Sequence, residues 1–382
     1  MKMKPKFETL AIKSTENTFH NSEPVSTPIY LSSTYKRNED GSYNNDFVYS
    51  RTNNPNRAIV EKSIAQLESG KFAFAFSSGM AAVSSVIQSL KYGDHILLPD
   101  DIYYAIKKLM DEVFAQWGIT YDLVDMTNLH SIEKFIKPST SLIWIESPSN
   151  PQLKISDVKA ISEIAHKHSF LCAVDNTWLT PVFMNPLDLG ADIVVHSTTK
   201  YFGGHSDVLG GALVLNNDKI AEKIKNIQLL NGSVPAPFDC WLIARGIQTL
   251  HLRVSKQSKN AFILAQFLNQ HPKIEKVNYP GLEIHPQHLI AKKQQKNGFG
   301  AMLSVLIKGD EKNAFEISTK LKHFTTATSL GGVESLVEHR KSVEGPDSLT
   351  PVNLIRISVG IEHVDDLIAD WEQALSNPTS VN

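Results

Sequence analysis

The chain has 382 residues, of which 42% are hydrophobic and 20% are charged. A chain of this length can bury a large core and exceeds one ordinary domain, so about two domains are expected. The 38 Lys and Arg residues nearly balance the 40 Asp and Glu residues, for a net charge of -2. This balance leaves no basic surface of the kind that binds nucleic acid or an acidic membrane.

Cysteine use and the absence of long apolar runs indicate a cytoplasmic location. Cys172 and Cys240 are the two cysteines, and Cys172 lies inside an apolar segment, which argues against a disulfide framework. The basic residues 1–6 are not followed by an apolar signal core. The longest apolar runs fall far short of the roughly twenty residues that span a bilayer. We therefore expect a soluble cytoplasmic protein with no nucleic-acid or membrane partner.

The first sixty residues are rich in Ser, Thr, Asn and Pro and contain no clear core element. Aromatic side chains recur in this segment, which argues against disorder. We therefore expect residues 1–60 to form an arm that contacts a neighbouring subunit. The aromatic residues are Tyr30, Tyr35, Phe47 and Tyr49.

Residues 61–255 alternate short apolar runs with helical patterns, which is typical of a mostly parallel α/β sheet covered on both faces. The helix expected over Asp157–His168 has one apolar face, and Ser156 is placed to cap its start. The strands are expected at Phe72–Phe76, His95–Leu98, Ile119–Val124, Ser141–Glu146, Phe170–Val174, Asp192–His196 and Gly211–Leu215.

Residues 256–382 have a different pattern, which predicts a smaller α+β domain. A helical stretch over Trp241–Phe267 leads into this domain. The strands expected here are Ile274–Tyr279, Gly300–Ile307 and Leu354–Val359, and the helices lie near Glu311–Leu321 and Val364–Leu375.

The segment around Lys200 carries the clearest chemical signal. Ser197 and Thr199 lie within three residues of this amine, just after an apolar strand. Asp175 ends another apolar strand, and ligands of such sheets collect at the carboxyl ends of strands. A nucleophilic amine, hydroxyls that can hold a phosphate and an acid that can pair with a ring nitrogen indicate a pyridoxal-phosphate (PLP) pocket. By itself, a lysine after a Ser/Thr cluster is more often a solvated loop charge.

Two further segments could bind the cofactor phosphate. Gly79 follows a strand and opens a helix, whose N-terminal N–H groups can face an anion. Tyr49 and Arg51 in the arm offer a phenol and a guanidinium fork. The chain has neither a GxxxxGK[ST] loop nor a GxGxxG turn after a strand, so motifs for nucleotide binding are absent.

Three more side chains could complete the site. Tyr103 follows a strand and could stack on a cofactor ring, with Tyr104 as a competitor one position away. Asn150, in a turn with two prolines, could donate a hydrogen bond to a phenolate oxygen, although turn formation is its more common role. Arg356 lies in an apolar run, where a charge is costly to bury unless it meets an anion such as a substrate carboxylate.

In this order the segments resemble the Cys/Met-metabolism family of PLP enzymes over nearly the whole chain. The resemblance implies the aspartate-aminotransferase-like fold (fold type I), with a mostly parallel seven-stranded sheet in the large domain and a smaller C-terminal domain. It also implies a homotetramer built from tight dimers. The matching segments are Tyr49–Pro55, Ser78–Met80, Tyr103, Pro148–Pro151, Val174–Thr177, Ser197–Lys200, Arg245–Leu250, Ser329–Ser335 and Arg356.

The resemblance also implies a role for each candidate residue. Lys200 bonds PLP and takes the Cα proton of the substrate, while Asp175 keeps the pyridine nitrogen protonated. Tyr103 stacks on the ring and can donate a proton to the departing sulfur. The cofactor-binding residues are Tyr49, Arg51, Gly79, Met80, Tyr103, Asn150, Asp175, Thr177, Ser197, Thr199 and Lys200, with Tyr49 and Arg51 reaching the phosphate of the neighbouring subunit. The residues for a sulfur amino acid substrate are Arg356, Ser329 and Asn150, and no metal site is expected.

Two positions bear on the reaction. Relatives that act on the γ-carbon of cystathionine often have an acid before Tyr-Ser-Arg and before Ser-Leu-Gly, where this chain has Val48 and Thr328. Neither side chain can pair with a distal ammonium group. We therefore expect a carbon–sulfur lyase that cleaves cystathionine by β-elimination to homocysteine, pyruvate and ammonia. γ-Replacement, γ-elimination, methionine γ-elimination and a PLP-binding protein without catalysis remain alternatives.

Overall fold

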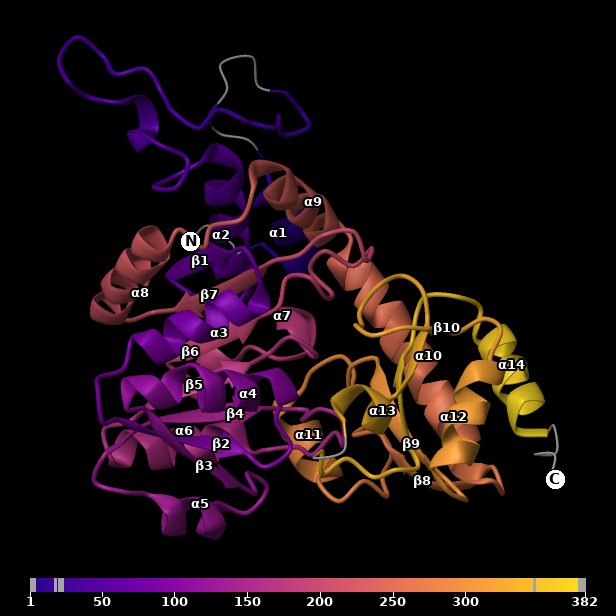
Figure 1. The fold of residues 1–382 in the computed structure, drawn as a ribbon. Coiled ribbons are helices and arrows are strands. Elements are labelled where there is room, and N and C mark those ends of the chain that lie inside the picture. Colours follow the sequence, from indigo (N-terminus) through magenta and orange to yellow (C-terminus); the bar gives the residue numbers. More distant parts are fainter. Residues whose placement is uncertain (1–4, 17–18, 20–23, 346–347, 377–382) are drawn as a thin grey trace.

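The structure, a computed structural model, describes residues 5–16, 19, 24–345 and 348–376 (Figure 1). These residues build a seven-stranded sheet and a five-stranded sheet. Helix α10 (Leu250–Gln270) lies between them, contacting α9 (Pro237–Gln248) on one side and β8 (Ile274–Asn278) on the other. The boundary expected at residues 255/256 falls within this helix.

The large sheet is mostly parallel, as predicted. Its order is β1-β7-β6-β5-β4-β2-β3, and only β7 runs antiparallel to its neighbours. The strands are β1 (Phe72–Phe76), β2 (His95–Pro99), β3 (Thr120–Val124), β4 (Thr140–Glu146), β5 (Leu171–Asp175), β6 (Ile193–His196) and β7 (Gly211–Leu215).

Both faces of this sheet are covered, which explains the nearly continuous apolar strands. In β5, Val174 joins the hydrophobic core on one face and Ala173 joins the core on the other. Because successive side chains of a strand point to opposite faces, apolar residues are needed at both positions. The covering and connecting helices are α2 (Pro55–Leu67), α3 (Gly79–Gln88), α4 (Tyr104–Glu112), α5 (Leu129–Phe135), α6 (Val158–Lys167), α7 (Thr180–Phe183) and α8 (Asp218–Asn231), with 3-10 turns at Asn44–Asp46, Phe114–Trp117 and Pro186–Leu189.

Two details differ from the sequence-based expectations. Helix α1 (Phe7–Lys13) packs on α2 and α9 with Ala11 fully buried, so the first sixty residues do contain a core element. A single small residue in a seven-residue helix leaves too weak a pattern to detect. Helix α6 is capped by Asp157, whose side chain accepts a hydrogen bond from the Ala160 N–H, and not by Ser156. Ser156 instead donates its N–H to Ser147 in the core.

The small sheet has the order β10-β11-β12-β9-β8 and is antiparallel except between β10 and β11. The predicted helical stretch Trp241–Phe267 is two helices, α9 and α10, which meet at Thr249. The remaining strands are β9 (Met302–Ile307), β10 (Thr325–Thr326), β11 (Leu336–His339) and β12 (Leu354–Ser358). The remaining helices are α11 (His288–Gln294), α12 (Glu311–Lys320), α13 (Arg340–Glu344) and α14 (Val364–Ser376).

Within the described ranges, no helix has both the length and the apolar character needed to cross a membrane.

Candidate active site

A pocket of about 290 Å³ lies at the carboxyl ends of the strands of the large sheet and is bordered on the small-sheet side by the loop Thr328–Leu330, α13 and β12. Most of the residues predicted from the sequence meet here, although they come from segments far apart in the chain. Those lining the pocket are Gly79, Met80, Tyr103, Asn150, Asp175, Thr177, Ser197, Thr199, Lys200, Ser329 and Arg356.

Lys200 lies in the turn that follows β6. Its Nζ donates a 2.6 Å hydrogen bond to Ser329 Oγ from the small-sheet side of the pocket. Burial, followed by the charge of the Arg356 guanidinium, lowers the pKa of the amine to about 8. A lysine with this pKa is partly neutral near physiological pH, as a nucleophile or a base requires.

Hydroxyls and backbone N–H groups gather on one side of Lys200. Helix α3 begins at Gly79, so its first N–H groups have no partner within the helix. A Cβ atom added at Gly79 would lie only 3.0 Å from Ser197 Cβ, so glycine allows the helix start to approach the Ser197 hydroxyl closely. Thr199 Oγ1 is fixed by the Gly210 N–H at 3.0 Å. The same hydroxyl donates to the Gly210 carbonyl at 3.2 Å, so the start of α3 and the Ser197 hydroxyl are the groups that suit a bound phosphate.

Asp175 is the buried acid of the site. It ends β5 and accepts a 2.9 Å hydrogen bond from the Thr177 N–H, while burial raises the pKa of its carboxyl group. A protonated ring nitrogen next to it would compensate for the buried charge. Glu146 lies opposite Asp175 in the register of β4 and β5, and its Oε2 accepts a 2.9 Å hydrogen bond from the Tyr103 N–H. Burial, followed by the charge of Asp175, raises the pKa of Glu146 well above its usual value.

Tyr103 lies directly before α4 and packs edge-on against Tyr104, with ring centroids 5.1 Å apart. Burial raises the pKa of its phenol, and Tyr104 adds to the effect. The phenol therefore stays protonated at neutral pH and can act as a proton donor.

Arg356 lies in β12 and is almost fully buried. It donates 3.1 Å hydrogen bonds to Asn150 Oδ1 and to the Ser329 carbonyl, and it forms a 2.7 Å ion pair with Glu338. Asn150 therefore serves as an acceptor for the arginine in this structure. The arrangement places a guanidinium at the pocket wall, where a carboxylate can reach it.

Tyr49 and Arg51 lie outside this pocket. Arg51 Nη1 donates a 2.9 Å hydrogen bond to the Leu229 carbonyl, and its guanidinium lies 5.6 Å from the centre of the Tyr49 ring. The Tyr49 side chain is 45% exposed. Their contact with the phosphate of a neighbouring subunit stays a prediction.

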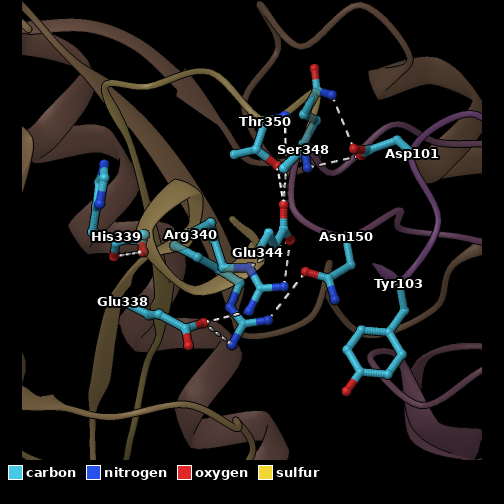
Figure 2. Close-up of polar contacts among 12 residues, drawn as sticks. Asp101, Tyr103, Asn150, Glu338, His339, Arg340, Glu344, Ser348 and Thr350 are labelled. Carbon is cyan, nitrogen blue, oxygen red and sulfur yellow. Dashed lines mark hydrogen bonds and ion pairs between the residues drawn. The ribbon is translucent and has the colours of Figure 1, made fainter. Parts of the chain in front are cut away.

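Sequence reasoning missed a buried row of charges beside Arg356. Glu338 pairs with Arg340, and Arg340 pairs with Glu344, as Figure 2 shows. Arg340 also lines the pocket. The sequence carries little sign of this row of charges. Strand β11, which carries Glu338, has only four residues, and two of them, Glu338 and His339, are polar.

The donor set fits PLP. The pocket offers an amine that is partly neutral near pH 8, a buried acid for a ring nitrogen, hydroxyls and a helix start for a phosphate, and an aromatic ring for stacking. Lys200 would hold the cofactor covalently, Asp175 its ring nitrogen and Ser197 its phosphate. Arg356, which also lines the pocket, could bind the carboxylate of an amino acid.

Comparisons with known proteins agree with this chemistry. The chain is 46% identical over 357 residues to a cystathionine gamma-synthase of Mycobacterium tuberculosis, with 92% of each chain covered. It is also 46% identical over 359 residues to a cystathionine beta-lyase of Lactococcus lactis, covering 92% of this chain and 94% of that protein. A crystal structure of metB from Corynebacterium glutamicum superposes with a TM-score of 0.95 at 41% identity, covering 98% of both chains. Residues 8–376 match the model of one enzyme family. The chain therefore belongs to the Cys/Met metabolism PLP-dependent enzyme family.

Proposed function

We propose that this enzyme cleaves cystathionine by β-elimination, so that cystathionine and water give homocysteine, pyruvate and ammonia. The observation that carries this proposal is the neutral Thr328 in the pocket wall, directly before Ser329. The carboxylates that line the described pocket are Glu146 and Asp175, and each accepts a hydrogen bond from a backbone N–H. Neither carboxylate lies directly before Tyr-Ser-Arg or Ser-Leu-Gly, where relatives that act at the γ-carbon often have an acid.

The residues of the pocket supply what β-elimination needs. Arg356 binds the substrate carboxylate and aims the Cα–H bond at Lys200. Lys200 Nζ takes the Cα proton, and Tyr103, protonated at neutral pH, donates a proton to the departing sulfur. When bound, PLP accepts the electron pair left at Cα. γ-Chemistry requires a further proton to be removed at Cβ by the same lysine.

A second candidate is γ-replacement, in which an activated homoserine ester and cysteine give cystathionine and the free acid. It is supported by the cystathionine gamma-synthase of Mycobacterium tuberculosis, which is as similar in sequence as the beta-lyase of Lactococcus lactis, at 46% identity in each case.

We also propose that the enzyme is a cytoplasmic homotetramer built from tight dimers. In this arrangement Tyr49 and Arg51 of each subunit complete the phosphate site of the neighbouring one. The exposed Tyr49 ring and its contact with Arg51 leave both side chains at the surface of the single subunit, which supports such a role.

Analysis of the keto acid formed from cystathionine tests the reaction. Pyruvate formed in equal amount with homocysteine supports β-elimination, and 2-oxobutyrate without pyruvate overturns it. Incubation of O-succinylhomoserine with cysteine tests the second candidate, because only γ-replacement forms cystathionine. The Lys200→Ala variant serves as the control for non-enzymatic products in both assays.

A further inference from the structure

We propose that Arg340 is a positioning residue for substrate binding, which holds Glu338 back so that Arg356 keeps N–H groups available for the substrate carboxylate. The inference rests on the proposed role of Arg356 as the carboxylate clamp. Arg340 itself belongs to the row of charges formed by Glu338, Arg340 and Glu344 (Figure 2).

A single carboxylate oxygen is shared between two guanidinium groups. Glu338 and Arg356 face each other in the register of β11 and β12. Glu338 Oε2 lies 2.7 Å from Arg356 Nη2 and also 2.7 Å from Arg340 Nη1. Its other oxygen, Oε1, is buried and has no hydrogen-bond partner among the described residues.

Arg340 prevents the unpaired Oε1 of Glu338 from also bonding to Arg356. A carboxylate and a guanidinium prefer two parallel hydrogen bonds, and Glu338 makes only one contact of this kind with Arg356. Without Arg340, rotation of Glu338 would bring Oε1 onto Arg356 as well. Arg356 has five N–H groups, and Asn150, the Ser329 carbonyl and Glu338 use three of them, so a second contact with Glu338 would leave one N–H group in place of two. The charge that attracts a substrate carboxylate would also be neutralised more fully.

Arg340 is held in place firmly enough to compete with Arg356 for Glu338. Its Nη2 and Nε contact Glu344 Oε1 at 2.5 and 3.1 Å, and its guanidinium lies 5.9 Å from the centre of the Tyr104 ring. Glu344 is fixed in turn by the hydroxyls of Ser348 and Thr350. The Arg340 side chain is only 3% exposed, so water cannot replace these contacts.

The charge of Arg340 also reaches the reacting amine. Burial lowers the pKa of Lys200 most, and the charges of Arg356 and Arg340 lower it further, whereas Glu338 raises it. Loss of Arg340 is therefore expected to raise the pKa of Lys200 as well as to weaken carboxylate binding.

The test compares the binding of two amines to the holoenzyme. L-Alanine has a carboxylate but no leaving group, and ethylamine lacks the carboxylate, so the ratio of their dissociation constants isolates the carboxylate contact. Binding is followed through the visible absorbance of the bound cofactor. Arg340→Met is expected to raise the dissociation constant of L-alanine about tenfold relative to that of ethylamine, since a change in the pKa of Lys200 affects both amines alike.

A double-mutant cycle separates this mechanism from a general loss of structure. In a Glu338→Gln background the same Arg340→Met change is expected to leave the ratio of the L-alanine and ethylamine dissociation constants within about twofold, because no carboxylate remains to be held back. Arg340→Lys, which keeps one charge next to Glu338, is expected to recover part of the affinity. Lys312→Met removes an exposed cation from α12 and serves as the matched control.

Two outcomes overturn the inference. One is an unchanged ratio of the L-alanine and ethylamine dissociation constants in Arg340→Met, and the other is an equal change of this ratio with and without Glu338. If Arg340→Met does not fold, Arg340→Lys takes its place. Its effect is then compared in the wild-type and Glu338→Gln backgrounds. Arg356→Gln tests the proposed function separately. An unchanged ratio of the alanine and ethylamine dissociation constants in that variant would show that Arg356 does not bind the substrate carboxylate.

Discussion

Lys200 Nζ and Ser329 Oγ are joined by a 2.6 Å hydrogen bond across 129 positions of the chain. Ser329 adopts a positive φ of 86°. Gly331, two residues further on, lies so close to Tyr201 that an added Cβ would be 2.9 Å from the Tyr201 backbone nitrogen. The loop of the small sheet thus packs directly on the Lys200 segment, and the direction of the amine depends on this contact.

Removal of the Ser329 hydroxyl is expected to leave the Lys200 amine less well oriented, while the cofactor stays bound. Ser329→Ala keeps the Cβ and the backbone and deletes only the hydrogen bond to Lys200. We expect kcat/KM to fall about tenfold, the effect of one lost hydrogen bond to a charged group. Cofactor content, measured by absorbance, should stay at the wild-type level. Thr319→Ala, which removes a hydroxyl bonded only to its own helix, is the control and should leave kcat/KM unchanged.

Lys200→Ala is expected to abolish covalent attachment of PLP and nearly all turnover. Borohydride reduction followed by peptide mass analysis should find pyridoxyl on Lys200 in the wild-type protein and nowhere in the variant. A variant that still turns over cystathionine at the wild-type rate contradicts the role given to this amine.

Reattachment of PLP to the apo-protein should depend on pH. Only the neutral amine attacks the cofactor aldehyde, and burial lowers the pKa of Lys200 from 10.5 to about 8. The rate of recovery of the visible band should therefore rise with pH and level off above about 8. A rate that keeps increasing up to pH 10.5 would show that burial does not activate this lysine.

Arg51→Ala is expected to weaken cofactor retention if the arm completes the site of a neighbouring subunit. Dialysis against buffer without PLP measures the loss. Mixing this variant with Lys200→Ala should restore part of the activity, because a subunit with an intact Lys200 can receive Arg51 from its partner. Absence of rescue in oligomers shown to be mixed counts against the shared site.

Glu68 is expected to stabilise the fold under the site. Its fully buried carboxylate accepts hydrogen bonds from His196 at 2.5 Å and from Asn176 at 2.8 Å. Glu68→Ala leaves both donors without this partner and should lower the free energy of unfolding by about 3 kcal/mol. Denaturant unfolding of the holoenzyme measures the change. Glu16→Ala removes an exposed ion pair with Lys13 and should change the free energy of unfolding by less than about 1 kcal/mol.

The sequence alone determined the large sheet and the residues at its edge. Buried strands such as β5 show as apolar runs because both of their faces are covered, and the polar residue that ends each run marks the carboxyl edge. Asp175 could be placed this way, and Lys200 follows within four residues of the end of β6, so both positions follow from local periodicity. Arg356 was found for the related reason that a charge inside an apolar strand needs an anion.

Only the tertiary structure decided which side chains face one another across the pocket. The Lys200–Ser329 bond and the pairing of Glu338 with both Arg340 and Arg356 join segments whose spacing carries no periodic signal. The first contact depends on a loop of the small sheet that packs on the turn after β6, and the pairing of Glu338 with Arg356 depends on the register of β11 and β12. No local propensity encodes either. Burial, which lowers the pKa of Lys200, is likewise a property of the folded chain, in which the distant Ser329 contacts the amine.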